Sequence, residues 1–126
     1  MIKYIILFLC MILVLSCNRN QEIITNLKFF DTYNPNIING EKVFNKSCIT
    51  CHLYGTAGAT LLTNTKEWEF LLNSKDKKEI YLNVYNGFIG QNGPMPAKGG
   101  CMNCSEKDLF DAIEYILSVN KFTINH

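Results

Sequence analysis

The residues best suited to chemistry are four cysteines in two pairs of equal spacing, Cys48 with Cys51 and Cys101 with Cys104. Only the first pair is followed directly by a histidine, His52. The pattern Cys-x-x-Cys-His is the attachment sequence of c-type haem, in which two thiols bond to the porphyrin and the adjacent imidazole binds the iron. We therefore predict that Cys48 and Cys51 attach one haem c through thioethers and that His52 is an axial ligand.

Zinc binding and thiol redox chemistry are the alternatives for paired cysteines. Zinc ribbons place their pairs roughly 15–20 residues apart, whereas 49 residues separate Cys51 from Cys101. A thioredoxin-like pair needs a βαβ context, and the chain shows no pattern of parallel strands. Haem attachment is the favoured interpretation because it also uses the adjacent His52.

A second axial ligand is expected from residues 87–100. This segment holds five of the eight glycines and two of the three prolines, which indicates a loop. Within it, Met95 lies between two prolines that restrict the backbone on both sides. We predict that the thioether of Met95 binds the iron, with the terminal His126 as an unanchored alternative. Two filled axial positions leave no place for a substrate, which indicates one-electron carriage and not an enzyme.

The N-terminal residues predict an exported protein with a lipid anchor. Residues 4–15 carry no charge, and as a helix they reach only ~18 Å, short of the ~30 Å hydrocarbon core of a membrane. Such a run is typical of a secretory signal peptide, with an uncleaved anchor as the alternative. The sequence Val14-Leu15-Ser16-Cys17 resembles the cleavage box of bacterial lipoproteins. We therefore predict a signal peptide at 1–16 and lipidation of Cys17.

The remaining chain is predicted to form a tether at 17–37 and one domain at 38–126. The tether is rich in asparagine and has no helical period. The sequence has 12 basic and 11 acidic residues and no basic stripe, which argues against nucleic acid as a partner. We place the protein in the periplasm, attached to a membrane through its lipidated N-terminus.

Hydrophobic spacing predicts an all-α fold with three to five short helices around one covalently attached haem. The first helix is expected to begin at a cap on Asn39 and to run into the haem motif. Two short helices are expected around 66–73 and 75–86. Ser105 is expected to cap the last helix in a Ser-x-x-Asp pattern with Asp108.

Together these residues resemble the class I c-type cytochromes, and the cytochrome c5 group in particular. The resemblance covers about 38–119. It rests on Gly40 and Phe44 before the haem motif, on Trp68, and most specifically on the segment Asn92–Ser105. It implies the small class I cytochrome c fold, in which the first helix packs on the last.

The resemblance also implies roles for single residues. Met95 would be the sixth ligand of the iron, and Cys101 and Cys104 would form a short disulfide before the last helix. Thr60 stands where the family usually has proline. Its carbonyl is expected to accept a hydrogen bond from the ring of His52.

These interpretations combine into one predicted function. The protein is expected to be a monohaem cytochrome c that passes single electrons between redox partners of a respiratory chain. One alternative is the haem c subunit of a periplasmic dehydrogenase or oxidase complex. Another is a gas-binding haem sensor in which Met95 dissociates from the iron.

Overall fold

The computed structural model describes residues 32–122 together with Tyr4. Most of the predicted signal peptide at 1–16, the predicted lipidation site Cys17 and the alternative ligand His126 lie outside the described residues. Among the described residues, no helix is both long enough and apolar enough to cross a membrane.

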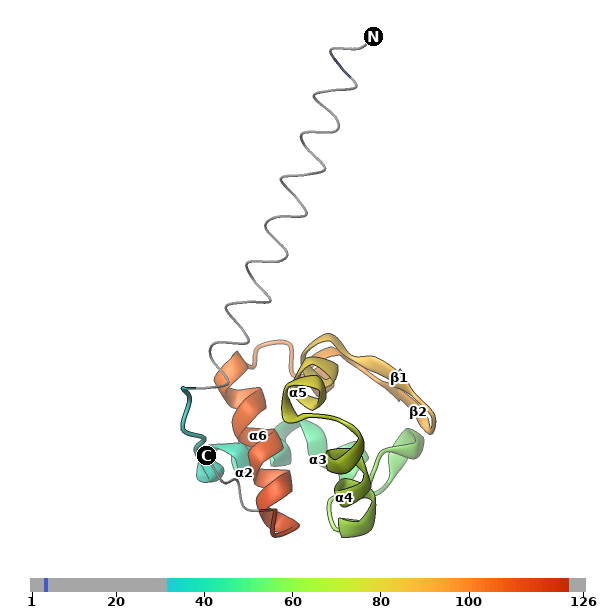
Figure 1. Ribbon diagram of the computed structural model, residues 1–126. Helices are drawn as coiled ribbons and strands as arrows, with labels where there is room; N and C mark the ends of the chain where they lie inside the picture. The colour runs from blue at the N-terminus through green and yellow to red at the C-terminus, as the bar shows by residue number, and fades with distance from the viewer. Residues whose placement is uncertain (1–3, 5–31, 123–126) are drawn as a thin grey trace. The chain divides into compact units, whose positions relative to one another are not determined.

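Helices dominate the compact unit Asn34–His126, which confirms the predicted all-α class (Figure 1). Within residues 32–122 there are five α-helices and three short turns of π or 3-10 helix. In chain order the helical elements are α2 (Ile37–Val43), the π-helical turn η1 (Phe44–Cys48), α3 (Ile49–His52), the 3-10 turn η2 (Thr56–Gly58), α4 (Thr65–Ser74), α5 (Lys77–Asn86), the 3-10 turn η3 (Ala97–Gly100) and α6 (Glu106–Val119).

A small antiparallel hairpin lies between α5 and η3. Its strands are β1 (Phe88–Gly90) and β2 (Gly93–Met95), and Phe88 pairs with Met95. The sequence predicted only a loop here, because strands of three residues are too short to show an alternating pattern. The hairpin therefore holds Met95 by strand pairing as well as by its flanking prolines.

The first helix begins earlier than predicted. Its N-cap is Asn36, whose side chain accepts a hydrogen bond from the backbone N–H of Asn39 at 3.1 Å. The predicted cap, Asn39, instead donates from its side-chain amide to Asp108 at 3.0 Å and to Asp111 at 2.8 Å. The prediction was wrong because these acceptors lie in α6, far away in sequence.

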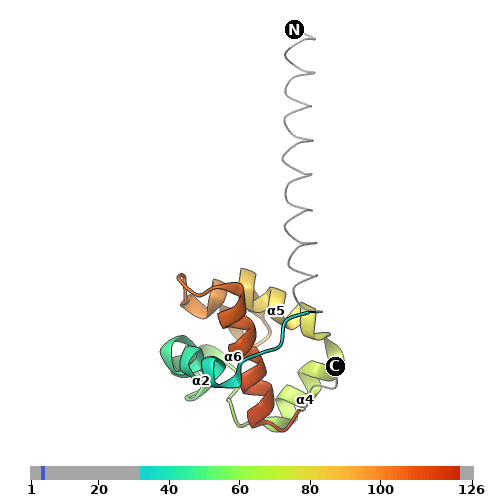
Figure 2. The same cartoon turned by 90° about the vertical axis from the view of Figure 1, so that its left-hand side faces the viewer.

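Helices α2 and α6 cross in close contact, as both views show (Figures 1 and 2). A Cβ atom at position 40 would lie 2.0 Å from the carbonyl oxygen of Asp111, so only Gly40 allows this approach. One turn further on, Phe44 is 1% exposed and its ring centroid lies 5.5 Å from that of Tyr115. The predicted packing of the first helix on the last is thus present.

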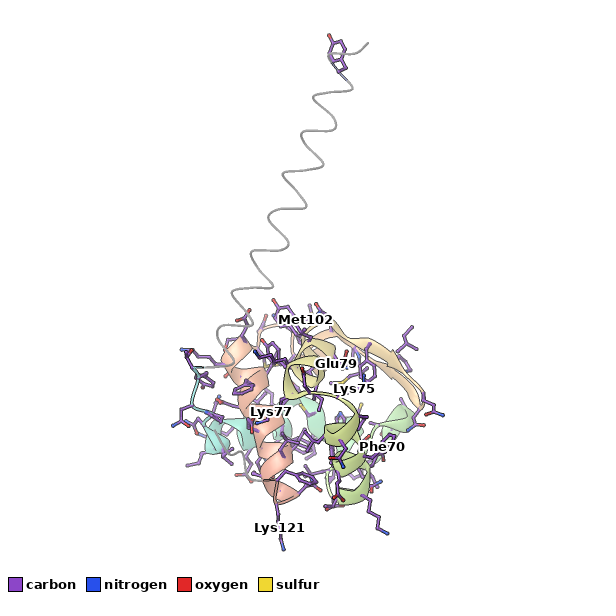
Figure 3. The ribbon with its side chains drawn as sticks, viewed as in Figure 1. Phe70, Lys75, Lys77, Glu79, Met102 and Lys121 are labelled. Atoms are coloured by element: carbon purple, nitrogen blue, oxygen red, sulfur yellow. A yellow bond between two sulfur atoms is a disulfide. The ribbon has the colours of Figure 1, made fainter. Side chains whose placement is uncertain are left out.

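Helix α5 is joined to α6 by a partly buried ion pair. The ammonium of Lys77 (labelled in Figure 3) lies 3.0 Å from the carboxylate of Glu114, whose side chain is fully buried. A charge removed from water needs a partner of opposite sign. The pair therefore fixes the start of α5 against the middle of α6.

Helix α6 begins with the predicted cap. The side chain of Ser105 accepts from the backbone N–H of Asp108, and the side chain of Asp108 accepts from the backbone N–H of Ser105 at 2.9 Å. Asp108 also accepts a hydrogen bond from the side-chain amide of Asn39. One carboxylate therefore closes the start of α6 and ties it to α2.

These hydrogen bonds make the stability of the fold depend on pH. The pKa of Asp108 is lowered, first by the hydrogen bond from Asn39 and then by those from Ser105. A lowered pKa contributes stability above the ordinary carboxyl pKa of 3.8, and this contribution is lost as the pH falls through the lower pKa of the folded state. We expect Asp108→Asn to destabilise the protein at pH 6 and to have a shrinking effect toward pH 3.

Urea unfolding of the haem-loaded protein, followed by far-ultraviolet circular dichroism across this pH range, measures the difference. Ser105→Ala, which removes one donor, should show an intermediate pH dependence. A constant gap between wild type and Asp108→Asn at every pH would contradict the prediction.

Candidate functional site

The unit encloses one large, mainly apolar cavity with a volume of about 510 Å³. This is within the range of about 300–1,000 Å³ that is usual for cofactor and ligand pockets. The cavity wall includes all four side chains predicted to bind haem: Cys48, Cys51, His52 and Met95. Its apolar wall includes five residues of α6, which are Leu109, Ala112, Ile113, Ile116 and Leu117, together with apolar residues of α4, α5 and the hairpin.

His52 is the last residue of α3, and the loop that follows fixes its ring. Its Nδ1 lies 2.8 Å from the carbonyl oxygen of Thr60, the partner expected from the sequence. A carbonyl can only accept, so Nδ1 carries the proton and Nε2 has its lone pair available for a metal. The backbone N–H of Leu62 donates to the carbonyl of His52 and closes the same loop.

Trp68 lies beside this ring on α4. It is 7% exposed, and its ring centroid is 6.0 Å from that of His52. Its indole N–H donates to the carbonyl of Leu61 at 2.9 Å. Trp68 therefore supports the loop that holds His52 through both apolar contact and a hydrogen bond.

Cys48 and Cys51 both carry free thiols and are partly buried at the cavity wall. Burial, followed by the neighbouring Cys51, raises the pKa of Cys48 to about 11. A thiol with a raised pKa stays protonated at neutral pH, whereas thiol–disulfide enzymes depend on a lowered one. This environment does not suit the thioredoxin-like alternative.

Met95 is brought to the cavity by the end of β2. The following turn η3 lies against both Met95 and Cys48. A Cβ atom at Gly99 would lie 3.8 Å from the Met95 methyl carbon and 4.0 Å from the Cys48 sulfur. Gly99 therefore marks the place where the hairpin meets the haem motif.

Cys101 and Cys104 form a disulfide with Cα atoms 5.4 Å apart. It removes two of the four thiols that a zinc site would need. Among the described residues, no group of three or more His, Cys, Asp or Glu side chains is arranged to hold a metal ion. Met102, within this short loop, is 71% exposed and does not line the cavity (Figure 3).

One polar residue at the cavity was not singled out from the sequence. The carboxylate of Glu67 accepts a hydrogen bond from the hydroxyl of Thr60 at 2.8 Å, the residue whose carbonyl binds His52. The spacing Asn64-x-x-Glu67 is typical of the start of a helix, and Asn64 is the N-cap of α4. That signal could have identified Glu67 as a fixed residue, although not its link to His52.

These residues fit haem c. The cavity is large and apolar, two thiols lie on its wall, and an imidazole with a fixed tautomer and a thioether are available as ligands. No ionised carboxylate set competes for a hard metal ion among the described residues.

The hydrogen bond of Trp68 yields a stability prediction. In Trp68→Phe the carbonyl of Leu61 loses its donor, and the smaller ring also leaves space, so we expect the free energy of unfolding to fall by about 1–3 kcal/mol. Urea unfolding of the haem-loaded variant measures this loss. Phe70→Leu, in the same helix but at a position 69% exposed, is the matched control and should change stability far less. Equal losses in both variants would contradict a special role for Trp68.

Comparison with known proteins gives independent information. The family model described as cytochrome c oxidase, cbb3-type, subunit III matches residues 35–116. Cytochrome c-555 of Prosthecochloris aestuarii is 30% identical over 91 residues, which cover 70% of this chain and 92% of that protein. Cytochrome c-555 of Chlorobaculum thiosulfatiphilum is 28% identical over 82 residues, which cover 65% of this chain and 94% of that protein.

The matched residues include the whole haem motif, the hairpin with Met95 and most of α6. Proteins of this kind bind haem c covalently and carry electrons, and they are not enzymes. The cavity, its thiols and its fixed imidazole agree with that chemistry. The chain therefore belongs to the cytochrome c family described as cbb3-type cytochrome c oxidase subunit III, and it is a class I c-type cytochrome, an electron carrier with covalently bound haem c.

Proposed function

We propose that this cytochrome is a membrane-tethered periplasmic protein that passes single electrons between partners of a respiratory chain. In this proposal Cys48 and Cys51 form the thioethers, and His52 and Met95 are the axial ligands. The observation that carries the proposal is that these four side chains line one cavity, with Nδ1 of His52 held at the carbonyl of Thr60.

When bound, the haem supplies an iron that is reversibly oxidised and reduced by one electron. The chain's own residues set the conditions for that change. The hydrogen bond to Thr60 fixes the orientation of His52 and makes its ring a better ligand. A thioether from Met95 favours the reduced iron more than a second imidazole would. The apolar side chains of α6 line the cavity, and an apolar surrounding of this kind affects the redox potential of the iron.

Exposed apolar side chains at the cavity support contact with redox partner proteins. Phe70 on α4 (labelled in Figure 3) is 69% exposed and Ile89 on β1 is 89% exposed, and both contribute to the cavity wall. Grouped apolar side chains on a surface mark interaction sites. This part of the wall is the place where we expect a partner protein to bind.

A haem subunit of a larger complex is the second candidate. The family description, which names subunit III of a cbb3-type oxidase, favours it. A partner that copurifies in fixed ratio with the tagged protein would support this alternative, and a protein that elutes alone would support the free carrier.

Within the class, we propose the cytochrome c5 group for this chain, because the sequence of residues 92–105 resembles that group.

Replacing Met95 tests the axial ligands. In Met95→Ala the haem should stay covalently attached through acid-acetone extraction, because the thioethers are intact. The ferric iron should become high-spin, and the ferrous iron should bind carbon monoxide, which the wild type should not do at neutral pH. Absorption spectra measure the spin state and the binding of carbon monoxide, and a redox titration records the accompanying change of midpoint potential. Met102→Ala is the matched control. An unchanged spectrum would remove Met95 from the site, and carbon monoxide binding to the wild type would favour the gas sensor.

Replacing Cys17 tests the tether. In Cys17→Ala the lipid attachment site is lost, so we expect the haem protein to move from the membrane fraction to the soluble periplasmic fraction. The haem stain of fractionated cells measures the distribution, and the spectrum of the released protein should be unchanged. Cys10→Ala, within the predicted signal peptide, is the control and should stay at the membrane. A Cys17→Ala protein that remains bound to membranes would support the uncleaved anchor.

A further inference from the structure

We propose that Glu67 is a positioning residue for both axial ligands of the haem iron. Its carboxylate joins the loop that holds His52 to the hairpin that carries Met95. The inference rests on the axial ligands assigned above, and it adds a residue that lies outside the haem motif.

The first half of the argument is a continuous chain of hydrogen bonds to His52. The ring N–H of His52 donates to the carbonyl of Thr60 at 2.8 Å, and the hydroxyl of Thr60 donates to Oε1 of Glu67 at 2.8 Å. Thr60 stands where the resembled family usually has proline, and a threonine lacks the proline ring that would restrict the backbone at this position. The second hydrogen bond supplies that constraint, because it holds the side chain of the residue whose carbonyl must face the imidazole.

Glu67 is itself held firmly enough to act as an anchor. It lies in the first turn of α4, where the positive end of the helix dipole favours a carboxylate. Its second oxygen, Oε2, accepts from the side-chain amide of Asn64 at 2.9 Å. The backbone N–H of Glu67 in turn donates to the side chain of Asn64, the helix N-cap. Both oxygens of Glu67 therefore have donors.

The second half of the argument is the contact between the His52 loop and the Met95 hairpin. The amide of Asn92, in the turn between β1 and β2, lies 3.5 Å from Oε1 of Glu67. Beside it the two backbones touch. A Cβ atom at Gly58 would lie 1.9 Å from the carbonyl oxygen of Asn92, and one at Gly93 would lie 2.2 Å from that of Ala57.

The position of Glu67 on the cavity wall gives it an electrostatic role as well. Oxidation adds one positive charge to the iron, and a fixed carboxylate nearby favours the form with more positive charge. Removing the charge should therefore raise the midpoint potential. Removing the hydrogen bond to Thr60 alone should loosen His52 and leave the charge in place.

Three variants of the haem-loaded protein separate these effects. Thr60→Val removes the hydroxyl, Thr60→Ser keeps it, and Glu67→Gln keeps the shape of the side chain but not its charge. Glu69→Gln is the matched control, because it removes the same charge from an exposed position in the same helix. Circular dichroism establishes that each variant is folded before the site is measured.

Two measurements test the proximal side, where His52 would bind the iron. Solvent exchange of the His52 ring N–H, followed by nuclear magnetic resonance in the reduced protein, should become about tenfold faster in Thr60→Val, the ratio that corresponds to one lost hydrogen bond to a charged group. Thr60→Ser should restore the wild-type rate. The midpoint potential should rise in Glu67→Gln and change less in Glu69→Gln.

The distal side, where Met95 would bind the iron, is tested by the rate at which added imidazole displaces Met95 in the ferric protein. We expect faster displacement in Glu67→Gln than in Glu69→Gln. Unchanged ring exchange in Thr60→Val, or equal potential shifts in the two glutamate variants, would overturn the role of Glu67. If Met95→Ala leaves the spectrum unchanged, the distal half of this inference fails together with the axial assignment, and the ring-exchange measurement still decides the proximal half.

Discussion

The crossing of α2 and α6 is the constraint on which the rest of the structure depends. At Gly40 the two backbones are so close that a single added carbon would overlap the carbonyl of Asp111. Helix α2 continues into the residues that carry the haem motif, and α6 supplies one apolar side of the cavity wall. The contact between the two helices therefore helps to place the haem motif beside the cavity.

The helix that begins with α2 changes to a wider π-helical turn before it reaches the haem motif. Residues Phe44–Cys48 form a π-helical turn, and such turns are frequent at functional sites. Phe44 at its start is buried toward Tyr115, while Cys48 at its end lines the cavity. Cys48 also packs against the core cluster that contains Phe44, so this one short segment contributes to both the helix crossing and the haem site.

Much of the site could be predicted from the sequence because its residue types and local spacing determine its chemistry. The haem motif, the proline-flanked Met95 and the Ser105 cap are all defined within a few neighbouring residues. Features that depend on distant partners were missed. The side chain of Asn39 donates hydrogen bonds to acceptors about 70 residues away in sequence. Likewise, no local sequence pattern predicts the ion pair between Lys77 and Glu114. The link from Glu67 to His52 also passes through Thr60, so it needs the folded loop.

The size of the cavity has a consequence for how the protein is made. The cavity of about 510 Å³ is lined mainly by apolar side chains, and such side chains lose packing contacts, and the fold loses stability, when no ring fills the space between them. A polypeptide without its ring would have little reason to stay compact. We therefore expect ring attachment to come before folding is complete, and a chain that missed attachment to be more open to proteases. The cavity thereby makes cofactor delivery a checkpoint for the survival of the protein.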